Sequence, residues 1–178
     1  MIWDRYRTDL RSFGRLAQQS IAYGKDSKLA RSLLAGDPSI GAVGASLEML
    51  ALVILWRVAC WPKSTTLVVT PWESQARSLF ALTQQMVAEA EPLLADRVIF
   101  AAGGKGLSCA ASTKIGAVHC SPGTLGRDLP DVSTAEAPLL VLVPSLDLIP
   151  GPHLKYAARL STRKGTTVLV NLLNRGRL

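Results

Sequence analysis

The chain has 178 residues, of which 48% are hydrophobic and 19% are charged. This composition excludes an intrinsically disordered protein and is sufficient for one domain with a buried core. Twenty Lys and Arg against 13 Asp and Glu give a formal net charge of +7, which favours anionic partners. The three cysteines, Cys60, Cys109 and Cys120, have no paired spacing and indicate reduced thiols in a cytosolic compartment.

No segment has the features of a membrane anchor or a signal peptide. The most apolar run, residues 47–56, contains Glu48 and stops before Arg57, so it is too short to span a bilayer. It also lacks the position and the flanking residues of a signal peptide. We therefore expect a soluble, cytoplasmic protein without a membrane partner.

The predicted elements alternate between helical and strand periods along the chain. The spacing of apolar residues predicts helices over 2–20, 27–35, 45–60, 72–90 and 152–161. Apolar and β-branched runs predict strands over 65–70, 98–102, 108–111, 117–120, 139–143 and 166–172. Apolar strands separated by helices favour a mainly parallel sheet with helices on both faces. We expect one α/β domain over 1–178, with 1–28 as a basic N-terminal helix packed on it or extending from it.

Residues 39–46, just before the predicted buried helix, carry part of the pattern of a phosphate-binding loop. That loop needs G-x-x-x-x-G-K-S/T, whose glycines let backbone N–H groups surround phosphates and whose Lys neutralises them. Gly44 and Ser46 stand at two of these positions, whereas Ser39 replaces the first Gly and Ala45 replaces the Lys. No strand is predicted before the loop. The helix N-terminus that remains attracts an anion weakly.

Two later segments complete a comparable pattern. The apolar strand 139–143 is followed by Pro144 and Ser145, where an ATPase has an Asp-Glu pair. Asp147 is close in sequence, but an extended chain separates it from that position by about 10 Å. The last predicted strand carries Asn171, which resembles a polar sensor of the γ-phosphate.

In order and spacing, these segments resemble the ATPase domain of phage terminase large subunits, the motors of DNA packaging. The resemblance runs from about residue 29 to the end and is strongest between Gly41 and Leu82. It implies a three-layer, P-loop NTPase-like fold of the RecA/ASCE type and a phage or prophage source. In that family a Lys at position 45 binds phosphate, and acids at 144 and 145 bind metal and activate water.

The departures from the family predict a pseudo-ATPase that is not an enzyme and has no cofactor and no metal. The predicted remnant of the nucleotide site consists of Ser39, Gly41, Gly44, Ala45, Ser46, Pro144, Ser145, Asp147 and Asn171. We expect function through a basic surface that binds a protein or nucleic-acid partner, in the bacterial host cell if the source is a phage. The predicted contact residues are Arg7, Arg11, Arg15, Lys155, Arg159, Arg163, Lys164, Arg175 and Arg177. A homo-oligomer is also compatible with the family.

Two alternatives stay open at this point. One is a functional but atypical ATPase of DNA packaging, in which Asp147 serves the metal and Lys105, Lys114 or Arg163 replaces the missing Lys. The other is a RecA-like regulatory protein of the SulA and ImuA type, which acts through protein contacts. The simplest interpretations are an ordinary helix entry for residues 39–46 and a solvated face for the N-terminal arginines.

Overall fold

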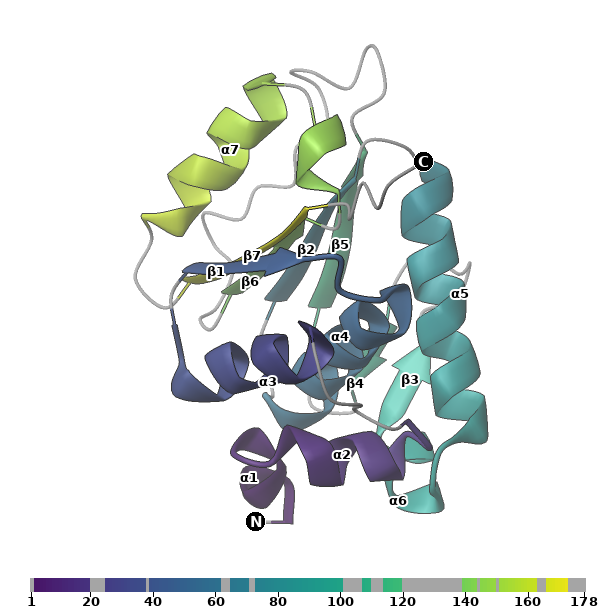
Figure 1. The fold of residues 1–178 in the computed structure, drawn as a ribbon. Coiled ribbons are helices and arrows are strands. Elements are labelled where there is room, and N and C mark those ends of the chain that lie inside the picture. The colour runs from purple at the N-terminus through teal and green to yellow at the C-terminus, as the bar shows by residue number, and fades with distance from the viewer. Residues whose placement is uncertain are drawn as a thin grey trace, which may run out of the picture.

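A computed structural model gives the arrangement of most of the chain (Figure 1). It describes residues 2–19, 25–37, 39–61, 65–70, 73–100, 107–109, 114–119, 139–143, 145–149, 151–162 and 166–172. Within these ranges a five-stranded sheet has the order β1-β7-β6-β2-β5, and all its paired strands are parallel. Its strands are β1 (Ser39–Val43), β2 (Thr65–Thr70), β5 (Lys114–His119), β6 (Leu139–Val143) and β7 (Thr166–Leu172). A separate antiparallel pair joins β3 (Val98–Phe100) and β4 (Leu107–Cys109).

The helices cover both faces of this sheet. They are α1 (Ile2–Arg7), α2 (Leu10–Leu16), α3 (Lys25–Ala35), α4 (Leu47–Cys60), α5 (Glu73–Glu89), α6 (Pro92–Ala95) and α7 (Gly151–Ser161), with the 3₁₀ helix η1 (Leu146–Leu148). β1 connects through α4 to β2, whereas β6 connects through α7 to β7 in the opposite direction along the sheet. Because such crossovers are right-handed, α4 and α7 lie on opposite faces, as Figure 1 shows.

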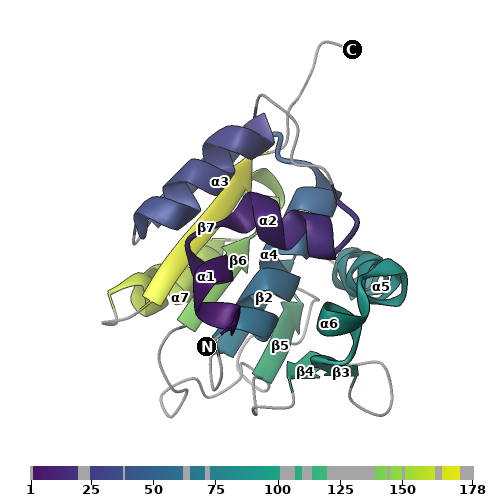
Figure 2. The ribbon, with the colours of Figure 1, turned by 90° about the horizontal axis from the view of Figure 1, so that it is seen from below.

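The centre of the core is α4, in which every residue from Met49 to Cys60 is buried. One face of the sheet contributes Ile40, Val68 and Leu169 to the hydrophobic core that contains α4. The helices α1 and α2 cover the side of α4 that the sheet leaves open (Figure 2). The prediction of a buried helix in this region is therefore confirmed.

The prediction of one continuous helix over 2–20 is wrong. The chain forms α1 and α2, separated by Thr8 and Asp9. Asp9 is the N-cap of α2, because its Oδ1 accepts a hydrogen bond of 3.0 Å from the backbone N–H of Ser12. This cap satisfies a backbone donor that the first turn of a helix leaves unpaired, so it favours the start of a second helix at Leu10.

None of the described helices is long and apolar enough to cross a bilayer. The predicted strands 108–111 and 117–120 correspond to β4 and β5, whose described residues begin earlier, at Leu107 and Lys114. The strand β1 was not predicted.

Candidate functional site

Part of the predicted remnant lies at one edge of the sheet, whereas Ser39 begins β1 at the opposite, amino edge and Pro144 is not among the described residues. The strands β1, β6 and β7 are parallel, so their carboxyl ends share an edge, and in open α/β sheets ligands bind at such edges. In the register, Val43 lies beside Leu172 and Val143 beside Val170. Gly44 directly follows the end of β1, and Ser145 lies two residues after the end of β6. The order of motifs in the sequence therefore places three distant segments at a common edge.

The segment read as a phosphate-binding loop is mostly a strand. Residues 39–43 form β1 and pair in register with residues 168–172 of β7, including Gly41 with Val170 and Ala42 with Asn171. The turn to α4 is left with Gly44 and the next two residues. Gly44 has φ +62°, a conformation that glycine adopts without steric cost. The expectation of a loop over 39–46 is thus wrong, because pairing with β7 holds most of its backbone extended.

The two residues after Gly44 have structural roles. The hydroxyl of Ser46 is the N-cap of α4 and accepts a hydrogen bond of 3.0 Å from the N–H of Met49. Ala45 is half-buried and packs against the hydrophobic core. Glu48 lies in the first turn of α4 and is exposed. Its carboxylate interacts favourably with the positive end of the helix dipole and would repel a phosphate bound there. This helix end is built to stabilise α4, and its side chains include no cation for a phosphate.

A polar pair with one fully buried member lies at the end of β6. Gln75, from the first turn of α5, donates a hydrogen bond of 2.6 Å from Nε2 to Oγ of the fully buried Ser145. The other amide atom, Gln75 Oε1, is buried and accepts no hydrogen bond from the described part of the chain. Asp147, in η1, is exposed. A buried hydroxyl thus stands where the resemblance implies a water-activating acid. Sequence reasoning did not select Gln75, although it lies in the segment that resembles terminases.

The remaining predicted ligands are dispersed or lie outside the described residues. Lys114 begins β5 and is paired with Thr65 at the amino edge of the sheet, opposite to the candidate site. Pro144, Lys105 and Arg163 are not among the described residues. In the described ranges, no group of three or more His, Cys, Asp and Glu side chains is arranged to hold a metal ion.

A second polar cluster, which sequence reasoning missed, lies at the C-terminal end of α4. Arg57 is 8% exposed, and its guanidinium lies 4.7 Å from the centre of the Trp61 ring. Its Nε and Nη2 atoms have no hydrogen-bond partner among the described residues, and burial lowers the pKa of Arg57 to about 10. Arg97 donates to the carbonyl of Ala59 over 3.3 Å. The negative end of the helix dipole favours cations here.

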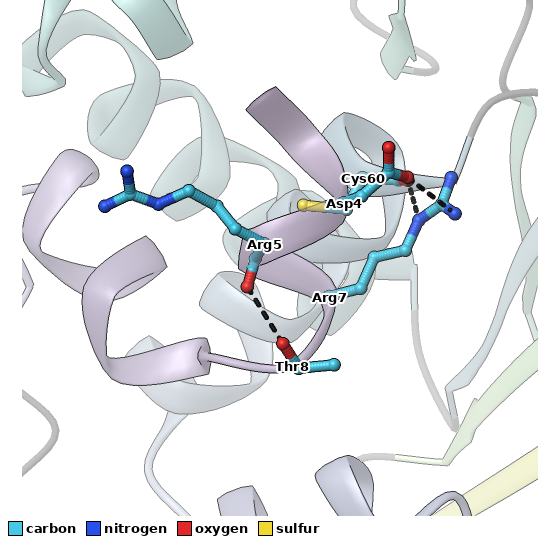
Figure 3. Close-up of polar contacts among 5 residues, drawn as sticks. All are labelled: Asp4, Arg5, Arg7, Thr8 and Cys60. Carbon is cyan, nitrogen blue, oxygen red and sulfur yellow. Dashed lines mark hydrogen bonds and ion pairs between the residues drawn. The ribbon is translucent and has the colours of Figure 1, made fainter. Parts of the chain in front are cut away.

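Arg7, predicted as a partner contact, belongs to this cluster. Its Nε donates a hydrogen bond of 2.7 Å to the carbonyl of Cys60, and its Nη1 lies 3.0 Å from Oδ1 of Asp4 (Figure 3). The same guanidinium lies 5.6 Å from the centre of the Trp61 ring. Arg7 therefore ties α1 to α4 and is half-buried, which differs from the exposed face that the sequence pattern indicated.

The other predicted contact residues fall on two separate faces. Arg11 and Arg15 are exposed on α2, and Arg11 donates to Oγ of Ser27 in α3 over 3.4 Å. Lys155 and Arg159 are exposed on α7, across the sheet. The rest, Arg163, Lys164, Arg175 and Arg177, lie outside the described residues. The described cations do not form one continuous surface.

The sequence and the fold were compared with those of known proteins. No protein-family model matches the sequence, and no curated protein matches it significantly. Among solved structures, the HK97 bacteriophage large terminase matches with a TM-score of 0.68 and 13% identity, over 96% of this chain and 36% of that one. The ATPase domain of the Thermus phage P74-26 large terminase matches with a TM-score of 0.63 and 17% identity, over 92% of this chain and 69% of that one. The chain spans about a third of the HK97 terminase and shares its fold with the ATPase domain of phage large terminases.

Proposed function

We propose that this chain is a pseudo-ATPase related to DNA packaging, which does not hydrolyse ATP and acts by binding a protein or nucleic-acid partner through basic surfaces. Its fold supports the relation to terminases. The phage or prophage source, the inactivity and the binding role are parts of the proposal.

One observation carries the proposal of inactivity: the backbone of residues 39–43 is paired with β7. A phosphate-binding loop works because several successive N–H groups converge on one anion. A strand directs alternate N–H groups to opposite sides, so it cannot make that cradle. The side chains give the same indication, since Ala45 supplies no positive charge and the hydroxyl of Ser46 caps α4.

The missing acids support the same conclusion. ATP hydrolysis needs a carboxylate near Mg²⁺ and a group that orients the attacking water. Gln75 donates a hydrogen bond of 2.6 Å from Nε2 to Oγ of Ser145, and neither residue carries a charge. Restoring one charged residue would therefore not restore the site.

The test is a phosphate-release assay on the purified chain with MgATP. We expect no release above background, and none in the variant Ala45→Lys/Pro144→Asp/Ser145→Glu, because β1 still replaces the loop. Titration calorimetry should detect no MgATP binding tighter than about 100 μM, which corresponds to roughly 5.5 kcal/mol. Turnover that disappears in Ser46→Ala would contradict the proposal.

The binding half of the proposal needs a separate test. Binding to a labelled DNA duplex and to polyglutamate is measured over a range of salt concentrations, for the chain and for two charge-reversed variants. Arg11→Glu/Arg15→Glu changes the α2 face, and Lys155→Glu/Arg159→Glu is its matched counterpart on α7. We expect affinity to fall with salt, and one variant to weaken binding more than the other. Equal affinity in all three proteins would contradict a role for either face.

An atypical working ATPase is the second candidate. It is favoured by Asp147, an exposed carboxylate two residues after Ser145 at the same edge of the sheet. In that case the calorimetric experiment gives Mg²⁺-dependent binding, and Asp147→Asn abolishes it.

A further inference from the structure

We propose that Arg57, near the end of α4, binds a carboxylate through the N–H groups of its Nε and Nη2 atoms, in a site completed by Arg7 and Trp61. The carboxylate belongs either to an Asp or Glu side chain of a partner protein or to a small free acid. This inference goes beyond the proposed function, because it needs neither the relation to DNA packaging nor the exposed basic faces of α2 and α7.

The first observation is the position of Arg57 within α4. It is the single charged residue in the stretch Met49–Cys60, all of which is buried. A charge that is removed from water is costly unless it is paired and hydrogen-bonded. Arg57 forms no ion pair within the described ranges, and its Nε and Nη2 atoms are buried there without a hydrogen-bond partner. The chain by itself therefore buries a cation that needs an acceptor.

The second observation is which N–H groups of Arg57 are unpaired. In a guanidinium, the N–H of Nε and one N–H of Nη2 are parallel and point to the same side of the group. Two parallel donors match the two oxygens of a carboxylate, which accepts a bidentate pair of hydrogen bonds. A single hydroxyl or carbonyl oxygen matches this pair less well. The unpaired atoms of Arg57 thus form one complete edge for the recognition of a carboxylate.

The surroundings of Arg57 add a second cation and an aromatic ring. The guanidinium of Arg57 lies 4.7 Å from the centre of the Trp61 ring, and that of Arg7 lies 5.6 Å from the same centre. The ring attracts both cations but supplies no oxygen acceptor. Arg7 and Arg97 donate hydrogen bonds to the carbonyls of the last two residues of α4, which compensates the negative end of the helix dipole. The helix end therefore does not repel an anion beside Arg57.

A ligand has to reach atoms that are covered in the chain by itself. Arg57 is buried, but its neighbours Arg7 and Trp61 are half-buried, so the site lies near the surface. Asp4 holds Arg7 in an ion pair whose side chains are 51% and 37% exposed, respectively (Figure 3). Exposed ion pairs contribute little to stability. An incoming carboxylate can therefore replace Asp4 and shift the side chain of Arg7 at a small energetic cost.

The burial of Arg57 favours a carboxylate over a nucleic-acid phosphate. A carboxylate is flat and stands at the end of a slender side chain, so it can enter a narrow opening. A phosphodiester is flanked by two sugars and belongs to a row of further charges, which exposed cations contact best. Arginine and tryptophan are also the residues that dominate the binding energy of protein interfaces.

The experiment follows the ¹H–¹⁵N resonance of Nε in Arg57, on the ¹⁵N-labelled full chain at low salt and slightly acidic pH. Its absence from the spectrum of Arg57→Lys assigns the resonance. Sodium acetate and polyglutamate are titrated, with sodium chloride, inorganic phosphate and a DNA duplex as separate arms. We expect acetate and polyglutamate to move the resonance downfield until it saturates, because a hydrogen bond to a carboxylate deshields the proton. If polyglutamate saturates at a lower carboxylate concentration than acetate, the ligand is a side chain of a partner protein; equal concentrations indicate a small acid.

Two variants test the geometry of the site. Arg57→Lys keeps the charge and removes the parallel pair of donors, so it should weaken the binding of labelled polyglutamate at least tenfold in fluorescence anisotropy. The matched exchange Arg159→Lys on α7 should change the affinity less than twofold. Asp4→Asn removes the competing carboxylate and should strengthen binding at least twofold, which tests the site even if Arg57→Lys does not fold. Circular dichroism checks the fold of each variant.

A stability measurement separates this site from a structural role of Arg57. Without carboxylate, Arg57→Met should melt at the same temperature as the unmodified chain or higher, because it removes an unpaired buried charge. Acetate should raise the melting temperature of the unmodified chain more than that of Arg57→Met, since a ligand stabilises the state that binds it. A clearly lower melting temperature of Arg57→Met without carboxylate would assign Arg57 a structural role and overturn the inference.

The resonance of Arg57 also has outcomes that overturn the inference. These are a shift with chloride as large as that with acetate, a larger shift with phosphate or with the duplex, and no shift at all. None of them changes the salt-dependent binding through α2 or α7 or the absence of MgATP hydrolysis. The failure of this site and the failure of the proposed function are therefore distinguishable.

Discussion

The two ends of α4 have opposite chemical characters. At its start, the turn at Gly44 and the cap at Ser46 serve the backbone of the helix. At its end, Arg7, Arg57 and Arg97 gather around the last carbonyls and two tryptophan rings. A nucleotide-hydrolysing protein concentrates cations and polar ligands at the start of such a helix. The comparison teaches that, in the described residues, the cations around α4 gather at its C-terminal end, where Arg7 and Arg97 hold other segments against the helix.

The largest expected effect is at the C-terminal half of α4. Trp56 is 2% exposed, its Nε1 donates a hydrogen bond of 2.7 Å to the carbonyl of Tyr6, and its ring meets Trp61 edge-on at 4.5 Å. Trp56→Ala should lower the free energy of unfolding by about 3–5 kcal/mol in urea titrations, since it leaves a cavity. Trp56→Phe keeps most of the ring and should cost less than half of that. Equal losses would mean that the hydrogen bond, and not the volume, dominates.

The next effect concerns Arg57 and pH. Its pKa is about 10 in the folded chain, below the ordinary value of an arginine, because it is buried. At pH values between this pKa and the ordinary pKa of an arginine, the unfolded chain binds more protons than the folded chain. The free energy of unfolding therefore rises with pH in this range. Relative to Arg57→Met, the unmodified chain should gain at most about 3 kcal/mol as pH rises above 10. Parallel denaturation of both proteins at several pH values measures the difference, and a constant difference would contradict the burial of the charge.

The smallest effect is at the start of α4. Ser46→Ala removes the N-cap and should cost about 1 kcal/mol in the free energy of unfolding, whereas Ser46→Asp should retain most of the stability. Thermal and urea denaturation check this without any nucleotide. If Ser46→Ala leaves stability unchanged, the hydroxyl is available for another role, and the contrast between the two ends of the helix weakens.

The parts of the fold that the sequence predicted are those with strong local patterns. The apolar run of α4 and the strands β2, β6 and β7 are continuous hydrophobic segments, and buried elements of this kind are recognisable without tertiary information. β1 has Gly41 and Ala42 within five residues, and its extended form depends on pairing with β7, which is distant in sequence. Propensity alone could not identify it.

The candidate site also has features that the sequence indicated and features that it did not. The resemblance implied one nucleotide site for the segments that contain Gly44 and Ser145, but their common place at the carboxyl edge of the sheet depends on β1, which was not predicted. The contact of Gln75 with Ser145 joins residues that are 70 positions apart in the sequence and meet only through folding. Arg57 and Trp61 are close in sequence, but the burial of Arg57 depends on the helices that pack around α4. The break between α1 and α2 was readable in principle, since Asp9 stands before a helical segment with Ser12 three residues later.

The arrangement of α1, α2 and α4 has a consequence for biosynthesis. An apolar helix with every residue buried from Met49 to Cys60 is prone to aggregate while it waits for its neighbours. The two helices that cover α4 precede it in the chain, so they have already emerged from the ribosome when α4 is synthesised. We expect a circular permutant that moves residues 2–19 to the other terminus to accumulate in inclusion bodies, although its finished contacts would be identical.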